Sequence, residues 1–187
     1  MNLAVYAQEN QEVKEQPAGI KWMTIQEAEA AVKVEPKKIF IDLYTDWCGW
    51  CKRMDATTFK DPAVIEYMHR NYYSVKFDAE SPDTLIFNNY TFYNLAQPGQ
   101  RKTTHLFAYS LLDGKTTYPS YAILDENLNR INVFAGYQKT TPFLATIMYF
   151  GTNQYQQYHQ FLIRQIQQQM QQQSQGAPAQ GTQAPAN

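Results

Sequence analysis

Two cysteines, Cys48 and Cys51, constrain the fold of this chain more than any other feature, and they are its only cysteines. They follow an apolar run, residues 39–44, which is bounded by lysines and a polar turn and therefore predicts a central strand buried on both faces. Beyond Cys51, apolar residues recur at helical spacing. The pair thus lies where a strand passes into a helix, and sulfurs at this spacing are within bridging distance.

The predicted position of Cys48 at the start of a helix indicates its chemistry. Unpaired backbone N–H groups and the positive end of the helix dipole favour a thiolate there. Cys48 would then attack the disulfide of a partner. Cys51, one turn into the helix and more buried, would attack the resulting mixed disulfide and release the product. We predict no cofactor beyond the redox-active Cys48–Cys51 disulfide itself.

Other uses of a Cys-x-x-Cys pair have different requirements. A structural zinc ion needs four ligands, and His69, His105 and His159 are far from the cysteines in sequence, so we predict no metal site. A c-type haem is excluded because Lys52 stands where the haem-binding motif needs a histidine. A purely structural disulfide stays open as an alternative, although a bridge that closes so small a loop constrains little of the unfolded chain.

The first half of the chain predicts a β-α-β unit. Thr24 and Glu27 have the spacing of a capping box at the start of a helix. The strand at 39–44 follows, and Asp61-Pro62 supplies the N-cap and first-turn residues of a further helix. Residues 72–78 predict a second strand, parallel to the first.

The second half of the chain predicts two hairpins and three helices. The aromatic hairpin, residues 84–93, turns at Asn88-Asn89, a dipeptide that tolerates positive φ at both positions, and we expect it near the active-site side. The other predicted elements are a loop at Pro98-Gly99, a short helix at 105–112, a hairpin joining 121–124 to 131–134, a helix at 141–149, and an amphipathic helix with Tyr155, Tyr158, Leu162, Ile166 and Met170 on one face. This order predicts an α/β fold with a central mixed sheet flanked by helices.

Composition and charge exclude several classes of protein and divide the chain. A formal net charge of −1 gives no field that would gather nucleic acid or anionic lipid. No apolar run approaches the ~20 residues that span a bilayer, so we predict no stable membrane insertion. We expect a leader at 1–19, one domain at 20–170, and a disordered tail rich in Gln, Pro and Ala at 171–187. Val5 and Ala7 fit a secretory cleavage pattern, which predicts a periplasmic or exported protein; an ordinary frayed start, which the missing basic and long apolar parts of a signal would fit, is the alternative.

Residues 40–52 resemble thioredoxins, which carry a buried acid where Asp42 stands, six residues before Cys48. Residues 58–64 extend the match, and residues 36–150 resemble the C-terminal, periplasmic thioredoxin-like domain of DsbD-type thiol:disulfide interchange proteins. The resemblance implies a thioredoxin fold and a role in passing electrons from the membrane to exported proteins and to cytochrome c maturation. It also implies that this chain is reduced by a separate electron donor, such as a membrane reductase.

The resemblance assigns roles to further residues. Tyr118-Pro119-Ser120 resembles the cis-proline loop of the family, which lies against the cysteines and pairs with substrate backbone. Asp55 matches an acid that the family places near its cysteines, with a solvated helix residue as the alternative. The chain departs from the family in two places: the stretch from Phe77 to Pro119 is longer, and Lys76 does not have quite the spacing of the lysine that partners the buried acid in thioredoxins.

Physical chemistry gives independent expectations for Asp42 and for the residues around the cysteines. An unpaired carboxylate in an apolar strand is costly, so the pKa of Asp42 should be raised, which suits a proton acceptor for Cys51. A hydrogen-bonded structural aspartate is the alternative. Trp47, Gly49 and Trp50 are predicted to contact substrate, with Trp47 turned towards the core and Trp50 towards the surface.

These observations predict a thiol–disulfide oxidoreductase of the cell envelope that acts as a reductase on the cysteines of partner proteins. The Gly-Trp dipeptide between the cysteines does not fix the redox direction, so an oxidase or isomerase of protein disulfides stays open. A non-catalytic binding module, which would dock its partners through the aromatic hairpin, is the alternative from a different class.

Overall fold

The computed structural model describes residues 17–96 and 103–175, with side chains described as far as residue 172. Most of the predicted leader, the loop at Pro98-Gly99 and the end of the predicted tail lie outside these residues. The contacts of the chain divide it into two units, one that ends at Leu144 and one that begins at Ala145. Both cysteines belong to the first unit.

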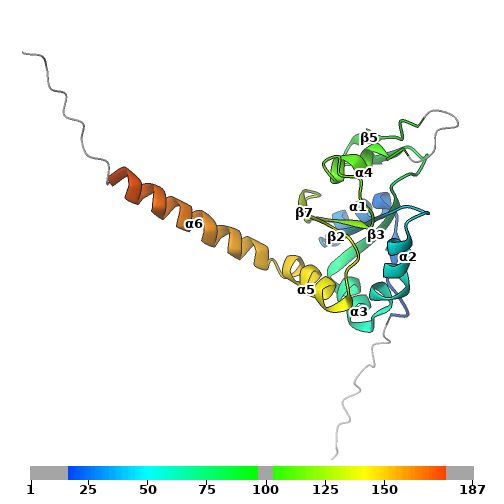
Figure 1. The fold of residues 1–187 in the computed structure, drawn as a ribbon, viewed down its shortest axis with the longest axis horizontal. Helices are drawn as coiled ribbons and strands as arrows, with labels where there is room; N and C mark the ends of the chain where they lie inside the picture. The colour runs from blue at the N-terminus through cyan, green and yellow to red at the C-terminus, as the bar shows by residue number, and fades with distance from the viewer. Residues whose placement is uncertain (1–16, 97–102, 176–187) are drawn as a thin grey trace, which may run out of the picture. The chain divides into compact units, whose positions relative to one another are not determined.

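A five-stranded mixed sheet forms the centre of the first unit (Figure 1). Its strands lie in the order β1-β3-β2-β6-β7, with the bounds β1 Trp22–Met23, β2 Lys38–Tyr44, β3 Tyr72–Asp78, β6 Ser120–Leu124 and β7 Arg130–Ala135. Strands β1, β3 and β2 run parallel, whereas β6 runs antiparallel to β2 and β7 antiparallel to β6. The predicted central, buried strand and its parallel partner are therefore confirmed.

The helices begin where the sequence supplies capping residues. Thr24 and Glu27 form the predicted capping box at the start of α1, and the side chain of Asp61 accepts a hydrogen bond from the backbone N–H of Ala63 at the start of α3. The helices are α1 Ile25–Val34, α2 Gly49–Ala56, α3 Pro62–Asn71, α4 Leu106–Leu111, α5 Thr140–Gly151 and α6 Gln154–Gln175, with a 3-10 turn at Thr58–Lys60.

Alternation of side chains along β2 gives the sheet two different faces. Ile41 and Leu43 are buried in one cluster with residues of α1, α4 and β4. Phe40 points to the opposite face, where its ring packs edge-on against Phe59. Because Asp42 alternates with Ile41 and Leu43, its carboxyl group lies on the same face as Phe40, towards α2.

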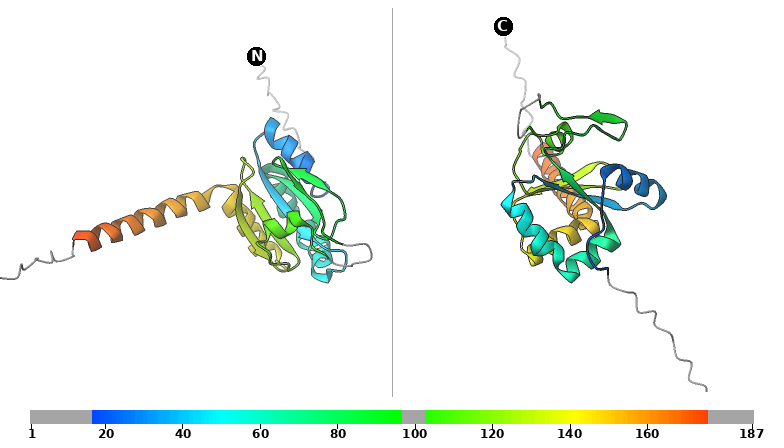
Figure 2. Two further views of the ribbon diagram at one scale, coloured as in Figure 1. Left: turned by 90° about the horizontal axis from the view of Figure 1, so that it is seen from above. Right: turned by 90° about the vertical axis from the view of Figure 1, so that its right-hand side faces the viewer.

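The aromatic hairpin is made of β4 (Leu85–Phe87) and β5 (Tyr90–Phe92), and its turn residues Asn88 and Asn89 have φ angles of 48° and 64°. The predicted hairpin and turn are confirmed. Its turn lies against α1, because the backbone N–H of Asn88 donates a hydrogen bond to Glu29 of that helix (Figure 2). The expected position of the hairpin near the active-site side stays a prediction. The alternating apolar side chains at 85 and 87 need burial, and the core against α1 and α4 provides it.

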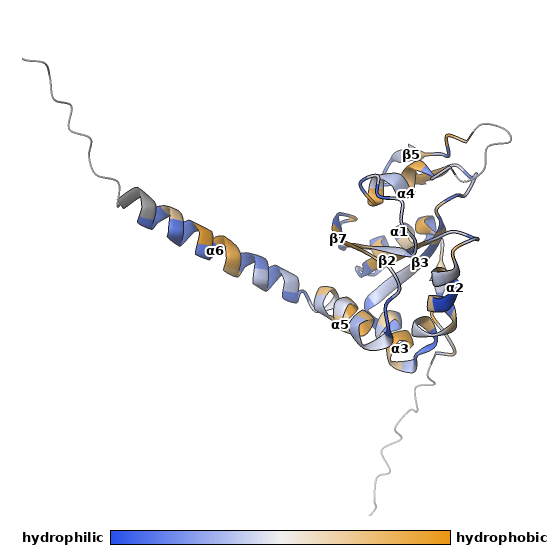
Figure 3. Ribbon diagram, viewed as in Figure 1, coloured by the Kyte–Doolittle hydropathy of each residue, from blue (hydrophilic) through white to orange (hydrophobic). Residues whose placement is uncertain are grey.

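In the second unit, α6 is the helix that the sequence predicts from its amphipathic stripe. Apolar residues recur along it (Figure 3), and the helix continues to Gln175. The prediction of a disordered tail from residue 171 is therefore wrong for residues 171–175, because the helix continues past the stripe that ends at Met170. None of the helices in residues 17–96 and 103–175 is both long enough and apolar enough to cross a membrane.

Candidate active site

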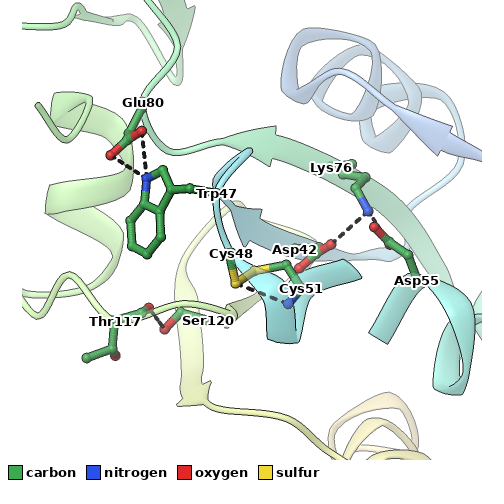
Figure 4. The surroundings of a disulfide bond; sticks show 9 residues. All are labelled: Asp42, Trp47, Cys48, Cys51, Asp55, Lys76, Glu80, Thr117 and Ser120. Atoms are coloured by element: carbon green, nitrogen blue, oxygen red, sulfur yellow. Dashed lines mark hydrogen bonds and ion pairs between the residues drawn. A yellow bond between two sulfur atoms is a disulfide. The ribbon is translucent and has the colours of Figure 1, made fainter. Parts of the chain in front are cut away.

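Cys48 and Cys51 form a disulfide at the start of α2, where the sequence predicts the pair to lie (Figure 4). Their Cα atoms are 5.3 Å apart. Cys48 is the N-cap residue of α2, and the backbone N–H of Cys51 donates a hydrogen bond to Cys48 Sγ over 3.1 Å. A donor aimed at this sulfur at the positive end of a helix stabilises negative charge on Cys48 when the disulfide opens.

The two cysteines differ by this hydrogen bond and not by burial. Cys48 is 4% exposed and Cys51 is 3% exposed, so the expected deeper burial of Cys51 is not observed. Cys48 nevertheless precedes the exposed Gly49, whereas Cys51 lies within the first turn of α2. The geometry of the helix start, and not solvent access, therefore distinguishes the attacking sulfur from the resolving one.

A buried carboxyl group lies on the strand behind the disulfide. Asp42 is 2% exposed, its Oδ2 lies 3.4 Å from Lys76 Nζ, and its Oδ1 has no hydrogen-bond partner among the residues that the structure describes. Burial raises the pKa of Asp42 to about 7, and the charge of Lys76 offsets only part of that effect. This carboxyl group can therefore gain or lose a proton near neutral pH, as a proton acceptor for Cys51 requires.

Lys76 connects Asp42 to Asp55 (Figure 4). The register of β2 and β3 places Lys76 directly beside Asp42, so this lysine partners the buried acid despite its different spacing in the sequence. Its ammonium group also pairs with Asp55 and lies 5.2 Å and 5.1 Å from the ring centres of Trp22 and Tyr44. Asp55 is thus joined to the site through Lys76 and is not merely a solvated helix residue.

Trp47 forms one wall beside the disulfide. Its side chain is 53% exposed, which corrects the expectation that it turns towards the core. The indole Nε1–H donates to both carboxylate oxygens of Glu80, at 3.0 Å and 2.9 Å, and the ring packs edge-on against Tyr118. An aromatic side chain that is exposed and held from two sides suits contact with a partner.

Trp50 lies between the two cysteines in the sequence, in the first turn of α2. Its side chain is 62% exposed, as predicted, and its ring lies 5.4 Å from that of Tyr137. Gly49, between the cysteines, is exposed, and a Cβ added there would meet no atom within 4 Å. The space above the first turn of α2 is therefore open to an incoming chain.

The Tyr118–Pro119 peptide bond is cis, as the resemblance implies. Ser120 follows it and pairs in register with Leu43, near the end of the strand that leads to Cys48. The Ser120 hydroxyl donates to the carbonyl oxygen of Thr117, and Figure 4 draws both residues beside the disulfide. The loop thus lies close to the cysteines, between Trp47 and β6.

The structure adds two residues that the sequence does not reveal. Glu80 holds Trp47, and Tyr137 supports Trp50. Both come from segments far from the cysteines, and no local motif marks either of them. Among the residues that the structure describes, no group of three or more His, Cys, Asp and Glu side chains is placed to hold a metal ion.

Comparison with known proteins agrees with this geometry. The model of the family Thioredox_DsbH, described as "Protein of unknown function, DUF255", matches residues 7–100. A curated relative, the thiol:disulfide interchange protein DsbD of Pectobacterium atrosepticum, is 39% identical over 46 residues, which are 25% of this chain and 8% of the length of that protein.

Two solved structures show the same fold at low sequence identity. A candidate disulphide-isomerase from Bacteroides thetaiotaomicron is 24% identical, with a TM-score of 0.50, and the alignment covers 73% of this chain and 96% of the other. A thioredoxin from Thermus thermophilus is 12% identical, with a TM-score of 0.50 and coverage of 70% and 85%. The mixed sheet with its flanking helices is therefore a thioredoxin fold.

Proposed function

The chain belongs to the thioredoxin-like DsbD/DsbH-type family, and from that premise we propose that it is a reductase of disulfides in partner proteins, working in the cell envelope. One observation carries the proposal: Cys48 caps α2, with the backbone N–H of Cys51 aimed at its sulfur and the buried Asp42 behind the pair. A disulfide that served stability alone would need neither a charge-stabilising donor nor an adjacent buried acid with a pKa near neutrality.

The proposed reaction transfers two electrons in two steps. The Cys48 thiolate attacks one sulfur of the partner disulfide, which forms a mixed disulfide and releases the other partner sulfur as a thiolate. Cys51 then loses its proton to Asp42 and attacks Cys48 Sγ. The Cys48–Cys51 disulfide forms, and the second partner sulfur leaves as a thiolate. A separate electron donor must reduce the pair before the next cycle.

Asp42 and the helix start act on the redox direction in opposite senses. A carboxylate behind the sulfurs opposes a second negative charge, whereas the start of α2 favours a thiolate on Cys48. The proposal is that the carboxylate has the larger effect, holds the thiols protonated and withholds thiolate stabilisation from the reduced form. We expect a reduction potential near the thioredoxin value of roughly −270 mV. A measured potential above roughly −180 mV, in the range of isomerases and oxidants, would contradict the reductase direction but not the roles of the cysteines.

Turnover separates this proposal from a binding module. Wild-type protein should accelerate the reduction of insulin by dithiothreitol. If it does not, although its own disulfide opens and closes normally, the enzyme proposal fails. The exposed hairpin residues Ile86 and Tyr90 would then be the first place to look for partner docking.

Trapping tests the roles of the two sulfurs. Cys51→Ser should accumulate mixed disulfides with partners, because only the second step is lost, whereas Cys48→Ser should form none. Non-reducing gels of both variants, each expressed at native level in the source organism, give the comparison. If Cys48→Ser alone captured partners, the assignment of the attacking sulfur would be reversed. Partners recovered only from the cytoplasm would contradict the proposed envelope location.

A further inference from the structure

A groove lies beside α2, next to the residue that follows Cys48, and is not used in the steps above. It has a volume of about 730 Å³ and is called here the Trp50 groove. Five residues line it: Gly49, Trp50, Arg53, Tyr137 and Lys139. The first three come from the start of α2, and the other two from the segment between β7 and α5. The groove therefore begins at the residue that follows Cys48.

Hydrogen bonds hold the floor of the groove in place. The Tyr137 hydroxyl lies 3.4 Å from Thr57 Oγ1. This hydrogen bond has the largest effect on the pKa of Tyr137, which it lowers, and the nearby Arg53 lowers it further. The neighbouring Gln138 carbonyl accepts a hydrogen bond from Thr58 Oγ1 at 2.6 Å. At the start of the segment, the Gly136 N–H donates to the Pro119 carbonyl oxygen at 2.8 Å. The same segment thus connects the groove to the cis-proline loop.

The Trp50 groove and the surroundings of Trp47 carry charges of opposite sign. Arg53 and Lys139 are exposed, and within residues 17–96 and 103–175 neither lies within ion-pair distance of a carboxylate. On the Trp47 side the charges are acidic: Glu80 holds the indole, and Asp46 and Glu80 help to raise the pKa of Asp78, after the larger effect of its burial. A carboxylate of a partner is therefore attracted to the Trp50 side and repelled from the Trp47 side.

We propose that the Trp50 groove binds an acidic side chain of the substrate protein, close in sequence to the cysteine that Cys48 attacks. The stem of a Glu side chain would lie on the rings of Trp50 and Tyr137, and its carboxylate would reach the guanidinium of Arg53 and the ammonium of Lys139. Arg53 is five residues from Cys48, about 7.5 Å along the helix, a distance that an extended chain covers in about two to three residues. This inference rests on the proposed function and names the class of substrate that it prefers.

Symmetric peptide dimers, joined by one disulfide, test the preference directly. Three versions carry Glu, Gln or Lys at two and three residues from the cysteine, and a fourth carries the same Glu residues far from it, at unchanged net charge. The reduced protein supplies both electrons, so each turnover yields two peptide thiols and the Cys48–Cys51 disulfide. Stopped-flow fluorescence measures the second-order rate constant for each dimer.

The Glu dimer should react about fivefold faster than the Lys dimer at low ionic strength, the scale of ion pairs at a partly exposed surface. The preference should decline in about 0.5 M salt, where charges are screened over a few ångströms. It should also be lost when the Glu residues are moved away from the cysteine.

Charge variants show whether the groove is responsible. Arg53→Gln with Lys139→Gln should bring the ratio of Glu to Lys rates close to one, and Arg53→Glu with Lys139→Glu should invert it. Lys21→Glu is the control that changes the net charge by the same amount as the double Gln variant. Lys21 is exposed and lines a different pocket, together with Lys37 and Tyr73. This control should keep the wild-type ratio.

Two results would overturn the inference in different ways. If wild-type protein reduced all the dimers at equal rates, or if the charge-reversed variant kept the Glu preference, the groove would not recognise acidic residues and the proposed function would stand. If none of the dimers were reduced, the proposed function would fail, and this inference with it.

Discussion

Replacing Asp42 by Asn tests whether the buried acid carries the electrostatic cost that its surroundings imply. Burial raises the pKa of Asp42 from 3.8 to about 7 in the folded protein, whereas the unfolded chain keeps an ordinary value. Between these two values the folded state binds more protons than the unfolded state. The free energy of unfolding therefore falls as pH rises from about 4 to about 7, and below that window Asp42 costs nothing because it is protonated in both states.

The magnitude follows from the size of the shift. One pKa unit corresponds to about 1.4 kcal/mol, so ionised Asp42 destabilises the oxidised protein by about 4 kcal/mol at pH 7 and above. Of this, about 2 kcal/mol develops between pH 5 and pH 7. Asparagine has nearly the same shape and does not ionise. Asp42→Asn should therefore stabilise the protein, by an amount that grows with pH through this window and then levels off.

Urea denaturation of the oxidised proteins at pH 5, 6, 7 and 8 measures the effect, because the disulfide is then the same in both proteins. The quantity of interest is the difference in unfolding free energy between Asp42→Asn and wild type at each pH. Asp46→Asn is the control for the change of residue type, since Asp46 is exposed and a surface substitution should change stability by less than about 0.5 kcal/mol. A difference that stayed constant from pH 5 to pH 8, or grew towards low pH, would refute the reasoning.

Three further predictions concern residues outside the cysteine motif. Leu85→Ala should lower the free energy of unfolding by about 2–4 kcal/mol, because Leu85 is buried in the core. Ile86→Ala, on the exposed face of the same strand, should lower it by less than about 1 kcal/mol. Equal losses in chemical denaturation would mean that the hairpin is not part of the core. His105 is buried and caps α4, and burial lowers its pKa, so its protonation opposes folding and stability should fall as pH drops through about 6.5. His105→Asn should remove that contribution. In the same denaturation series, the difference in unfolding free energy between the variant and wild type should narrow below pH 6, and a pH-independent difference would contradict the prediction. Glu80→Ala should release Trp47 and lower kcat/KM for a folded protein substrate about threefold, with little change in kcat/KM for a small disulfide compound. Equal losses for both substrates would mean that Glu80 acts on the cysteines and not on docking.

The sequence by itself determined the local structure of this protein. Caps, apolar periodicity and turn residues depend on a few neighbouring positions, so the capping box at Thr24, the helix start at Asp61 and the Asn88-Asn89 turn were all predictable. The placement of the cysteine pair where a strand passes into a helix belongs to the same class, because the apolar run and the motif are adjacent. The chemistry of the cysteines could be read for that reason.

Only the tertiary structure decided which distant residues meet around the disulfide. Lys76 reaches Asp42 because β2 and β3 pair in one particular register, and spacing along the chain alone pointed away from that contact. Glu80 meets Trp47, and Tyr137 meets Trp50, because the segments that carry them pack beside α2. Register and packing are fixed by the burial of the whole core and not by any single side chain, so these contacts left no local trace in the sequence.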